Sequence, residues 1–145
     1  MLPRSSYKRV LVAVDGSALS MRAADTAARL AKEEGASLTG IHIIASPAIE
    51  ITNNVADYYD EGRKQARKWM KDVENIAASR GMTIRTEILV GALSVLDMIL
   101  SYAENQSIDL IVSGVRGTTQ SRRLLVGSIA TGLIEHATCS VLVVR

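Results

Sequence analysis

Short, almost continuously apolar runs alternate along this chain with longer segments of helical periodicity, and this alternation limits the possible folds more than any other feature. Apolar runs of this kind fit strands that are buried on both faces, and the helices between them serve as crossover connections. Such crossovers place successive strands parallel in one sheet, with helices on both of its faces. The pattern predicts an α/β fold with a single doubly wound domain and a five-stranded parallel sheet. The predicted strands cover residues 9–14, 37–45, 82–90, 108–113 and 140–144.

About four helices are predicted between these strands, and polar or glycine residues mark their ends. Ser17 can cap the first helix, whose apolar side consists mostly of alanines, and Gly35 ends it. In the second helix, Trp69, Val73 and Ala77 share one apolar face. The last three predicted helices cover residues 55–80, 92–105 and 128–137.

Size and composition fit one ordinary globular domain. The 145 residues are 48% hydrophobic and 22% charged, and a chain of this length can bury a substantial core. Residues 1–6 are expected to form a flexible tail, so that the domain spans residues 7–145. No apolar run approaches the roughly 20 residues of a membrane span, and the N-terminus lacks the apolar segment of a secretory signal. The expected location is therefore the cytoplasm.

Charge and cysteine content exclude several functional classes. The net charge is only +2, and no basic block is longer than the pair Arg122 and Arg123. With no Phe and a single Trp, the chain lacks the aromatic side chains on which single-stranded nucleic acids stack. The single Cys139 excludes an intrachain disulfide and a multi-cysteine metal site. We interpret Cys139 as a small core residue, with a reactive thiol as the alternative.

A glycine-bearing loop follows the fourth predicted strand and leads into the last helix. It contains Gly114, two residues, Gly117, nine further residues, and then Gly127 and Ser128. Glycine lets a backbone approach phosphates closely, and a helix N-terminus offers N–H groups with a partial positive charge. The spacing therefore predicts a cradle for nucleotide phosphates, in which the Ser128 hydroxyl could bond one phosphate. Alternatively, Gly114 and Gly117 only turn the chain, and Ser128 is an ordinary helix N-cap.

Asp15 follows the first predicted strand. Ligands of doubly wound sheets bind beyond the carboxyl ends of the strands, where the strand order reverses, so Asp15 is expected beside such a site. A carboxylate there can accept hydrogen bonds from a ribose or a base, or bind a water on a nucleotide's metal ion. Its alternative role is that of a turn residue that helps Ser17 to cap the first helix. We interpret His42 as a strand residue packed near this site rather than as a catalytic base.

The motif G-x2-G-x9-G-S and the position of Asp15 resemble those of the ATP-binding universal stress proteins, and the resemblance extends over nearly the whole chain. It implies the strand order 3-2-1-4-5, with a crevice between the first and fourth strands. It also implies that Ala13 lines the base pocket, that the backbone of Ile43 contacts adenine, and that Ser113 lies near the ribose. The residues after the third glycine are implied to hold phosphates. Ala130 stands there in place of the usual Thr or Ser, which would remove one phosphate contact. The implied nucleotide-binding residues are Ala13, Asp15, Ile43, Ser113, Gly114, Gly117, Gly127, Ser128, Ile129 and Ala130.

The same resemblance implies an ATP-binding stress-response regulator or sensor that acts as a nucleotide-dependent homodimer. Family members commonly dimerise through the last strand, here Val141, Leu142, Val143 and Val144, and an apolar edge strand needs covering. ATP is the expected ligand, and whether Mg²⁺ accompanies it stays open. A downstream protein partner is expected, whereas nucleic acid and membrane partners are not.

Rapid catalysis is not expected, because the sequence lacks the G-x-x-x-x-G-K-[ST] loop of fast phosphoryl-transfer sites. The open alternatives are a slow nucleotide hydrolase, a flavin binder, and an interaction module of the same fold without a nucleotide. Arg122 and Arg123 lie in the body of the glycine loop. Either could neutralise a phosphate, or both are solvated surface charges.

Overall fold

Strands and helices alternate along the described part of the chain, as the apolar pattern predicts. The computed structural model describes residues 6–46, 55–91, 93–117 and 126–145. The strands are β1 (Arg9–Ala13), β2 (Ser37–Ala45), β3 (Arg85–Gly91), β4 (Leu110–Gly114) and β5 (Ser140–Val144). The helices are α1 (Ala18–Glu34), α2 (Val55–Ser79), α3 (Val95–Asn105) and α4 (Ser128–His136).

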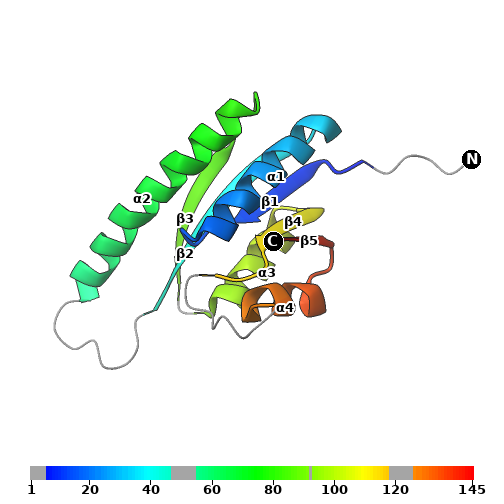
Figure 1. Cartoon of the computed structure of the whole chain (residues 1–145). Coiled ribbons are helices and arrows are strands. Elements are labelled where there is room, and N and C mark those ends of the chain that lie inside the picture. The colour runs from blue at the N-terminus through cyan, green and yellow to red at the C-terminus, as the bar shows by residue number, and fades with distance from the viewer. Residues whose placement is uncertain (1–5, 47–54, 92, 118–125) are drawn as a thin grey trace, which may run out of the picture.

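The five strands form one parallel sheet in the order β3-β2-β1-β4-β5, which confirms the expected fold class and strand order. The central strand is β1, where Val12 lies beside Gly40 of β2 and Val112 of β4. From β1 the chain builds the sheet outward through β2 to β3, and it then returns to the other side of β1 with β4. The order therefore reverses between β1 and β4, and the helices that follow these strands, α1 and α4, cover opposite faces of the sheet (Figure 1).

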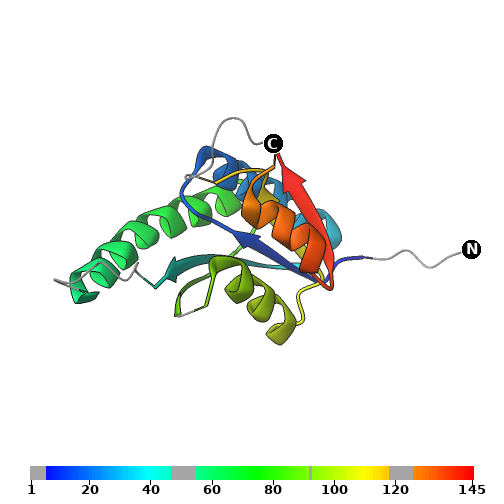
Figure 2. The ribbon, with the colours of Figure 1, turned by 90° about the horizontal axis from the view of Figure 1, so that it is seen from below.

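Helices cover both faces of the sheet, so that the domain has two apolar layers (Figures 1 and 2). Because successive side chains of a strand point to opposite faces, Val10 and Val12 are buried under α1 and α2, whereas Leu11 is buried toward α3 and α4. The buried side of α1 consists largely of alanines, whose small side chains let this helix pack closely against the sheet.

The third strand starts later than expected. Its apolar pattern predicted a start at Met82, but β3 begins at Arg85. The reason lies in the end of α2, because the backbone N–H of Met82 donates to the carbonyl of Ala77 at 2.9 Å. Gly81 adopts the left-handed conformation (φ 73°) that this type of helix ending requires. Residues 80–82 therefore complete the hydrogen bonds of α2 rather than those of the sheet.

The two ends of α1 match the predicted signals. The Ser17 hydroxyl accepts a hydrogen bond from the backbone N–H of Ser20, and Gly35 ends the helix in a left-handed conformation (φ 67°). Among the helices that the structure describes, none combines the length and the apolar character that crossing a bilayer requires.

Candidate functional site

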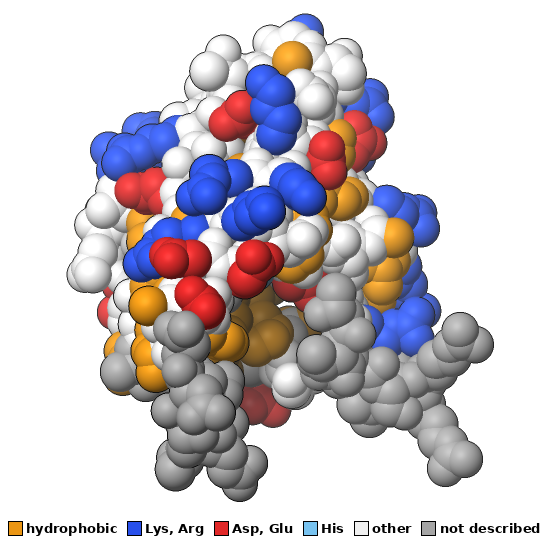
Figure 3. All heavy atoms as spheres, turned by 90° about the vertical axis from the view of Figure 1, so that its left-hand side faces the viewer, with side chains coloured by type: hydrophobic (Ala, Val, Ile, Leu, Met, Phe, Trp, Pro, Cys, Tyr) orange, Lys and Arg blue, Asp and Glu red, His pale blue; other side chains and the backbone are white. Residues whose placement is uncertain are grey.

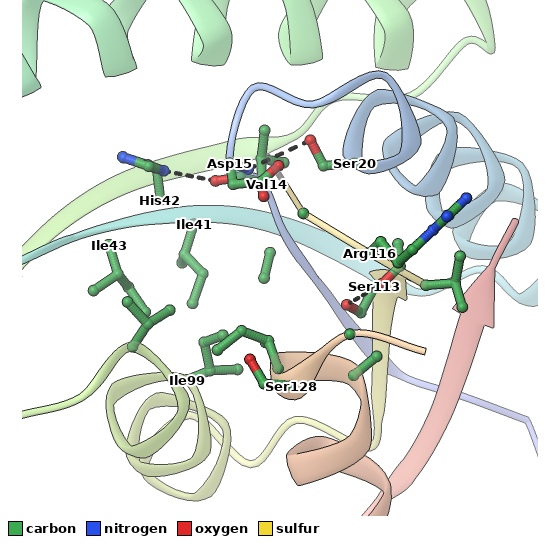
Figure 4. Close-up of a pocket in the computed structure, with 18 residues that line it drawn as sticks. Val14, Asp15, Ser20, Ile41, His42, Ile43, Ile99, Ser113, Arg116 and Ser128 are labelled. Atoms are coloured by element: carbon green, nitrogen blue, oxygen red, sulfur yellow. Dashed lines mark hydrogen bonds between the residues drawn. The ribbon is translucent and has the colours of Figure 1, made fainter. Parts of the chain in front are cut away.

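A cavity of about 300 Å³ lies beyond the carboxyl ends of β1 and β4, where the strand order reverses. Besides the loops after these strands, β2, α3 and the start of α4 contribute to its lining (Figure 4). The structure places every residue that the sequence singled out for nucleotide binding in this one lining. These residues are Ala13, Asp15, Ile43, Ser113, Gly114, Gly117, Gly127, Ser128, Ile129 and Ala130.

One side of the cavity is apolar. Ile41 and Ile43 of β2 and Ile99 of α3 gather there, and all three side chains are buried (Figure 4). Val95 and Ile129 extend this side. The sequence pattern placed Val95 and Ile99 only on the core face of a helix, because periodicity cannot distinguish a side chain that packs in the core from one that lines a cavity. An apolar wall of this kind suits the flat face of a heterocyclic ring.

Asp15 lies on the other side of the cavity and holds the turn between β1 and α1. Its Oδ1 accepts hydrogen bonds from the Ser17 backbone N–H at 3.0 Å and from the Ser17 hydroxyl at 2.6 Å. The Ser17 hydroxyl in turn accepts from the backbone N–H of Ser20 at 3.2 Å. The turn role considered from the sequence is therefore present in the structure. The carboxylate still lines the cavity, so the ligand role stays a prediction.

Gly117 passes directly beside the Asp15 carboxylate. A Cβ atom added to Gly117 would lie only 2.3 Å from Oδ2 of Asp15, and one added to Gly114 would lie 3.0 Å from the backbone of Leu19. Both glycines have negative φ angles, so a turn conformation does not explain them. Their small size lets the loop after β4 approach the β1–α1 region closely, which brings two segments of the site together.

The last glycine of the motif caps α4. Gly127 occupies the N-cap position with extended backbone angles, and Ser128 is the first residue of the helix. The alternative interpretation of Ser128 as the N-cap residue is therefore wrong. Gly127 has no side chain that could cap the helix, and the first turn of α4 lines the cavity. A helix start of this kind favours an anionic group.

The loop that joins β4 to α4 is closed at its base. The backbone N–H of Gly127 donates to the carbonyl of Val115 at 2.7 Å, and the N–H of Val115 donates to the carbonyl of Val144 at 2.8 Å. Gly117 and Gly127 are thereby held at the same end of the sheet, although nine residues separate them. Arg122 and Arg123 lie outside the described residues.

His42 connects the cavity lining to α2. Its Nδ1 lies 2.7 Å from the carbonyl oxygen of Val14, and because a carbonyl can only accept, Nδ1 carries a proton and donates. The ring also packs edge to face on Trp69, with 5.0 Å between the ring centroids. Trp69 in turn covers Gly16, where an added Cβ would lie 2.2 Å from the indole. His42 therefore packs beside the site, as its place in the sequence predicted.

Arg116 is the one Lys or Arg side chain in the described lining of the cavity. Its Nε is buried and has no hydrogen-bond partner among the described residues. Figure 4 shows the side chain running toward α1 and away from the isoleucine wall. Nothing in the sequence pattern singled out this residue.

No group of three or more His, Cys, Asp or Glu side chains that could hold a metal ion occurs in the described ranges. Cys139 packs against the apolar layer beneath α3 and α4. Burial, and to a smaller degree the negative charge of Asp109, raise the pKa of the Cys139 thiol. This environment suits a core residue better than a reactive thiolate.

Comparison with known proteins relates both the sequence and the fold to one family. The model of the universal stress protein family matches residues 6–145. Universal stress protein MJ0531 of Methanocaldococcus jannaschii is 34% identical over 145 residues, which cover 96% of this chain and 82% of that protein.

Two solved structures extend the comparison to three dimensions. Universal stress protein UspA from Lactobacillus plantarum superposes with a TM-score of 0.89 at 28% identity, covering 98% of this chain and 100% of that one. A universal stress protein solved in complex with cAMP superposes with a TM-score of 0.77 at 28% identity, covering 97% of this chain and 99% of that one.

Proposed function

The chain belongs to the universal stress protein family, and we propose that it is an ATP-binding regulator or sensor of the stress response. The observation that carries this proposal is the composition of the cavity. An apolar wall, a carboxylate and a helix N-terminus meet at the point where the strand order reverses. These three elements match the base, the ribose and the phosphates of a nucleotide.

Each part of the nucleotide has a counterpart in the described lining. The base would lie against Ile41, Ile43 and Ile99, where flat apolar contact is available. The ribose hydroxyls would donate to Asp15, the carboxylate beside that wall. The phosphates would face the N-terminus of α4, where Ser128, Ile129 and Ala130 form the first turn. Ala130 has no hydroxyl, so it would offer a phosphate only its backbone.

The relative solved with cAMP supports a nucleotide as the class of ligand. We propose ATP for this chain, because its motif G-x2-G-x9-G-S resembles that of the ATP-binding universal stress proteins. Mg²⁺, if present, would accompany the phosphates, and the calorimetric titration described below is run with and without it.

We propose a regulatory rather than a rapid catalytic role. The chain has no G-x-x-x-x-G-K-[ST] loop, so it lacks the lysine that fast phosphoryl-transfer sites place on the phosphates, and a bound nucleotide would be hydrolysed slowly. Slow hydrolysis remains the second candidate function, because Asp15 is a carboxylate inside the cavity.

We further propose that two copies pair through β5. This strand is at the edge of the sheet, bonded to β4 on one side only, and Val141 to Val144 are partly exposed. An edge of this kind presents unpaired N–H and C=O groups, which an antiparallel twin strand can satisfy. The helix α4 packs on β5 next to the cavity, so pairing at this edge could respond to the nucleotide.

Calorimetric titration with ATP, with and without Mg²⁺, tests the ligand assignment, with cAMP and FMN as comparison ligands. We expect saturable binding of ATP at about one site per chain and no binding of FMN. Gly127→Val should abolish this binding, because a branched side chain would obstruct the start of α4 where the phosphates are proposed to lie. Ala78→Val, at an exposed position near the far end of α2, is the matched control. Unchanged ATP affinity in folded Gly127→Val protein would show that this loop holds no phosphate.

A further inference from the structure

The exposed side of α2 carries a continuous line of charged residues. Four residues of this helix, Ala66, Met70, Val73 and Ala77, are buried against the sheet. On the opposite side, residues follow one another at intervals of three and four, so they fall within about 60° of one line along the helix. We call this line the α2 stripe. Its members, all exposed, are Asp57, Asp60, Glu61, Lys64, Arg67, Lys68 and Lys71.

Acidic and basic residues are separated along the α2 stripe. The three residues nearest the N-terminus of α2 are acidic, and the four that follow are basic. Figure 3 faces this side of the molecule and shows basic side chains gathered over its middle, with acidic ones below them. Asp60 lies 3.7 Å from Arg63 in an exposed ion pair, and the other six members form no ion pair with any described residue. The charges of the stripe are thus largely uncompensated within the chain.

The separated charges are complementary to those of a second copy turned by 180°. Glu61 and Arg67 each lie three residues from Lys64 along the helix, one before it and one after it. Asp60 and Lys68 are both four away, and Asp57 and Lys71 are both seven away. Successive residues turn by about 100°, so Glu61 and Lys68 share one flank of the stripe, and Asp60 and Arg67 share the other. In an antiparallel pair of α2 helices with a two-fold axis at Lys64, residues of the same flank meet, so Glu61 would face Lys68 and Asp60 would face Arg67. Asp57 and Lys71 lie close to the centre of the stripe and would face each other, so that every acidic member faces a basic one.

We propose that the α2 stripe is a self-association surface that binds the α2 stripe of a second copy in this antiparallel arrangement. The two-fold axis repeats each of the three opposite-charge pairs, and antiparallel helix dipoles add a favourable contribution. Exposed ion pairs are individually weak and are screened by salt, so the association is weak and salt-sensitive. Lys64 faces its own copy across the axis, and this repulsion limits the affinity.

The presence of an acidic block beside the basic one favours a second copy over a nucleic acid or an anionic membrane. An extended polyanion on the basic residues would also meet Asp57, Asp60 and Glu61 at one end and Asp72 at the other. The stripe is also separate from the edge strand β5, because α2 packs over β2 and β3 on the opposite half of the sheet. The proposal therefore does not depend on pairing through β5 or on the nucleotide.

Sedimentation velocity over a concentration series, at low and at high salt, tests the proposal on the full chain. The variants are made in a Val143→Lys background, so that pairing through β5 does not contribute. We expect self-association at low salt that high salt abolishes. Lys68→Asp should weaken it about tenfold or more, because two attractive pairs become repulsive. Lys8→Asp, an equal charge change at an exposed position outside α2, should leave it unchanged.

Two further variants distinguish the symmetric pairing from the binding of a polyanion. Adding Glu61→Lys to Lys68→Asp should restore association, since the facing pair regains opposite charges. Lys64→Gln should strengthen association by removing the repulsion at the axis, whereas loss of a cation would weaken binding to a polyanion. The proposal is overturned if the double variant does not regain self-association, if Lys64→Gln weakens it, or if the chain shows no salt-sensitive self-association. Far-UV circular dichroism checks that each variant keeps its helix content.

Discussion

At the residue scale, the close approach of Gly117 to Asp15 connects two parts of the site that are distant in sequence. The Asp15 carboxylate is already fixed by Ser17, so it has little freedom to move away from an added methyl group. A methyl group on Gly117 would lie 2.3 Å from Oδ2, well inside the van der Waals distance. The two residues are therefore expected to be energetically coupled.

A double-mutant cycle measures this coupling. Gly117→Ala alone should lower the free energy of unfolding by about 1–3 kcal/mol, because the loop or the carboxylate must shift. In an Asp15→Ala background the same change should cost much less, since the clashing oxygen is gone. Asp15→Ala itself should weaken ATP binding by about 1–3 kcal/mol if the carboxylate accepts a ribose hydroxyl. Urea unfolding and calorimetry provide the two readouts. If Gly117→Ala lowers the free energy of unfolding equally in both backgrounds, Gly117 and Asp15 are not coupled.

At the element scale, α1 and α2 are joined by an ion pair outside the cavity. Arg80, just after α2, donates two hydrogen bonds of 2.8 Å to the two carboxylate oxygens of Asp25 on α1. The hydrogen bond from Arg80, more than its charge alone, lowers the pKa of Asp25 below its ordinary value of 3.8. A lowered carboxyl pKa means that this pair stabilises the fold above pH 3.8 and that the contribution is lost as the pH falls through the lowered value.

The pH dependence of stability tests this pair. Asp25→Asn should lower the free energy of unfolding slightly at neutral pH, since the pair is largely exposed. The difference from the unchanged protein should disappear in acid, once Asp25 is protonated in both folded and unfolded chains. Asp72→Asn removes an exposed carboxylate that forms no ion pair with a described residue, and it serves as the control. A difference that persists with equal size in acid would argue that Asp25 acts through packing.

The edge strand β5 carries the next prediction at this scale. Val141 packs toward α3 and α4, and Leu142 and Val144 pack toward α1, whereas Val143 is partly exposed and joins neither apolar layer among the described residues. Val143→Lys should therefore leave the fold intact while placing two like charges at the proposed pairing edge. We expect dimerisation to weaken about tenfold or more, measured by sedimentation velocity at high salt. Val55→Lys, at an exposed apolar position at the start of α2, is the control. A dimer that survives Val143→Lys unchanged would exclude β5 as the interface.

At the scale of the whole molecule, the alternation of apolar runs and helical segments was sufficient to predict the α/β class and the position of each element. The strand order came from the family resemblance, because periodicity carries no information on which strands are neighbours. The start of β3 was predicted too early, since Met82 has a strand-like side chain but uses its N–H to end α2.

The site was predictable only in part, because its residues come from distant parts of the chain. The motif and the resemblance led to ten of the 18 residues that line the cavity, yet they did not lead to Ile99 or Arg116 (Figure 4). The contact between Asp15 and Gly117 spans most of the chain and depends on the order of the strands. The α2 stripe was missed for a similar reason, since its charges look dispersed in the sequence and align only when the helix is formed.

The edge-to-face contact of Trp69 with His42 gives the molecule an optical property. This is the only tryptophan of the chain, and its ring lies directly over Gly16, next to the aspartate of the cavity. The emission of an indole depends on the polarity and rigidity of its surroundings. Any rearrangement of the turn between β1 and α1 would therefore change the intrinsic fluorescence of the unlabelled protein. The fold thus contains its own reporter of this turn, and it needs no attached dye.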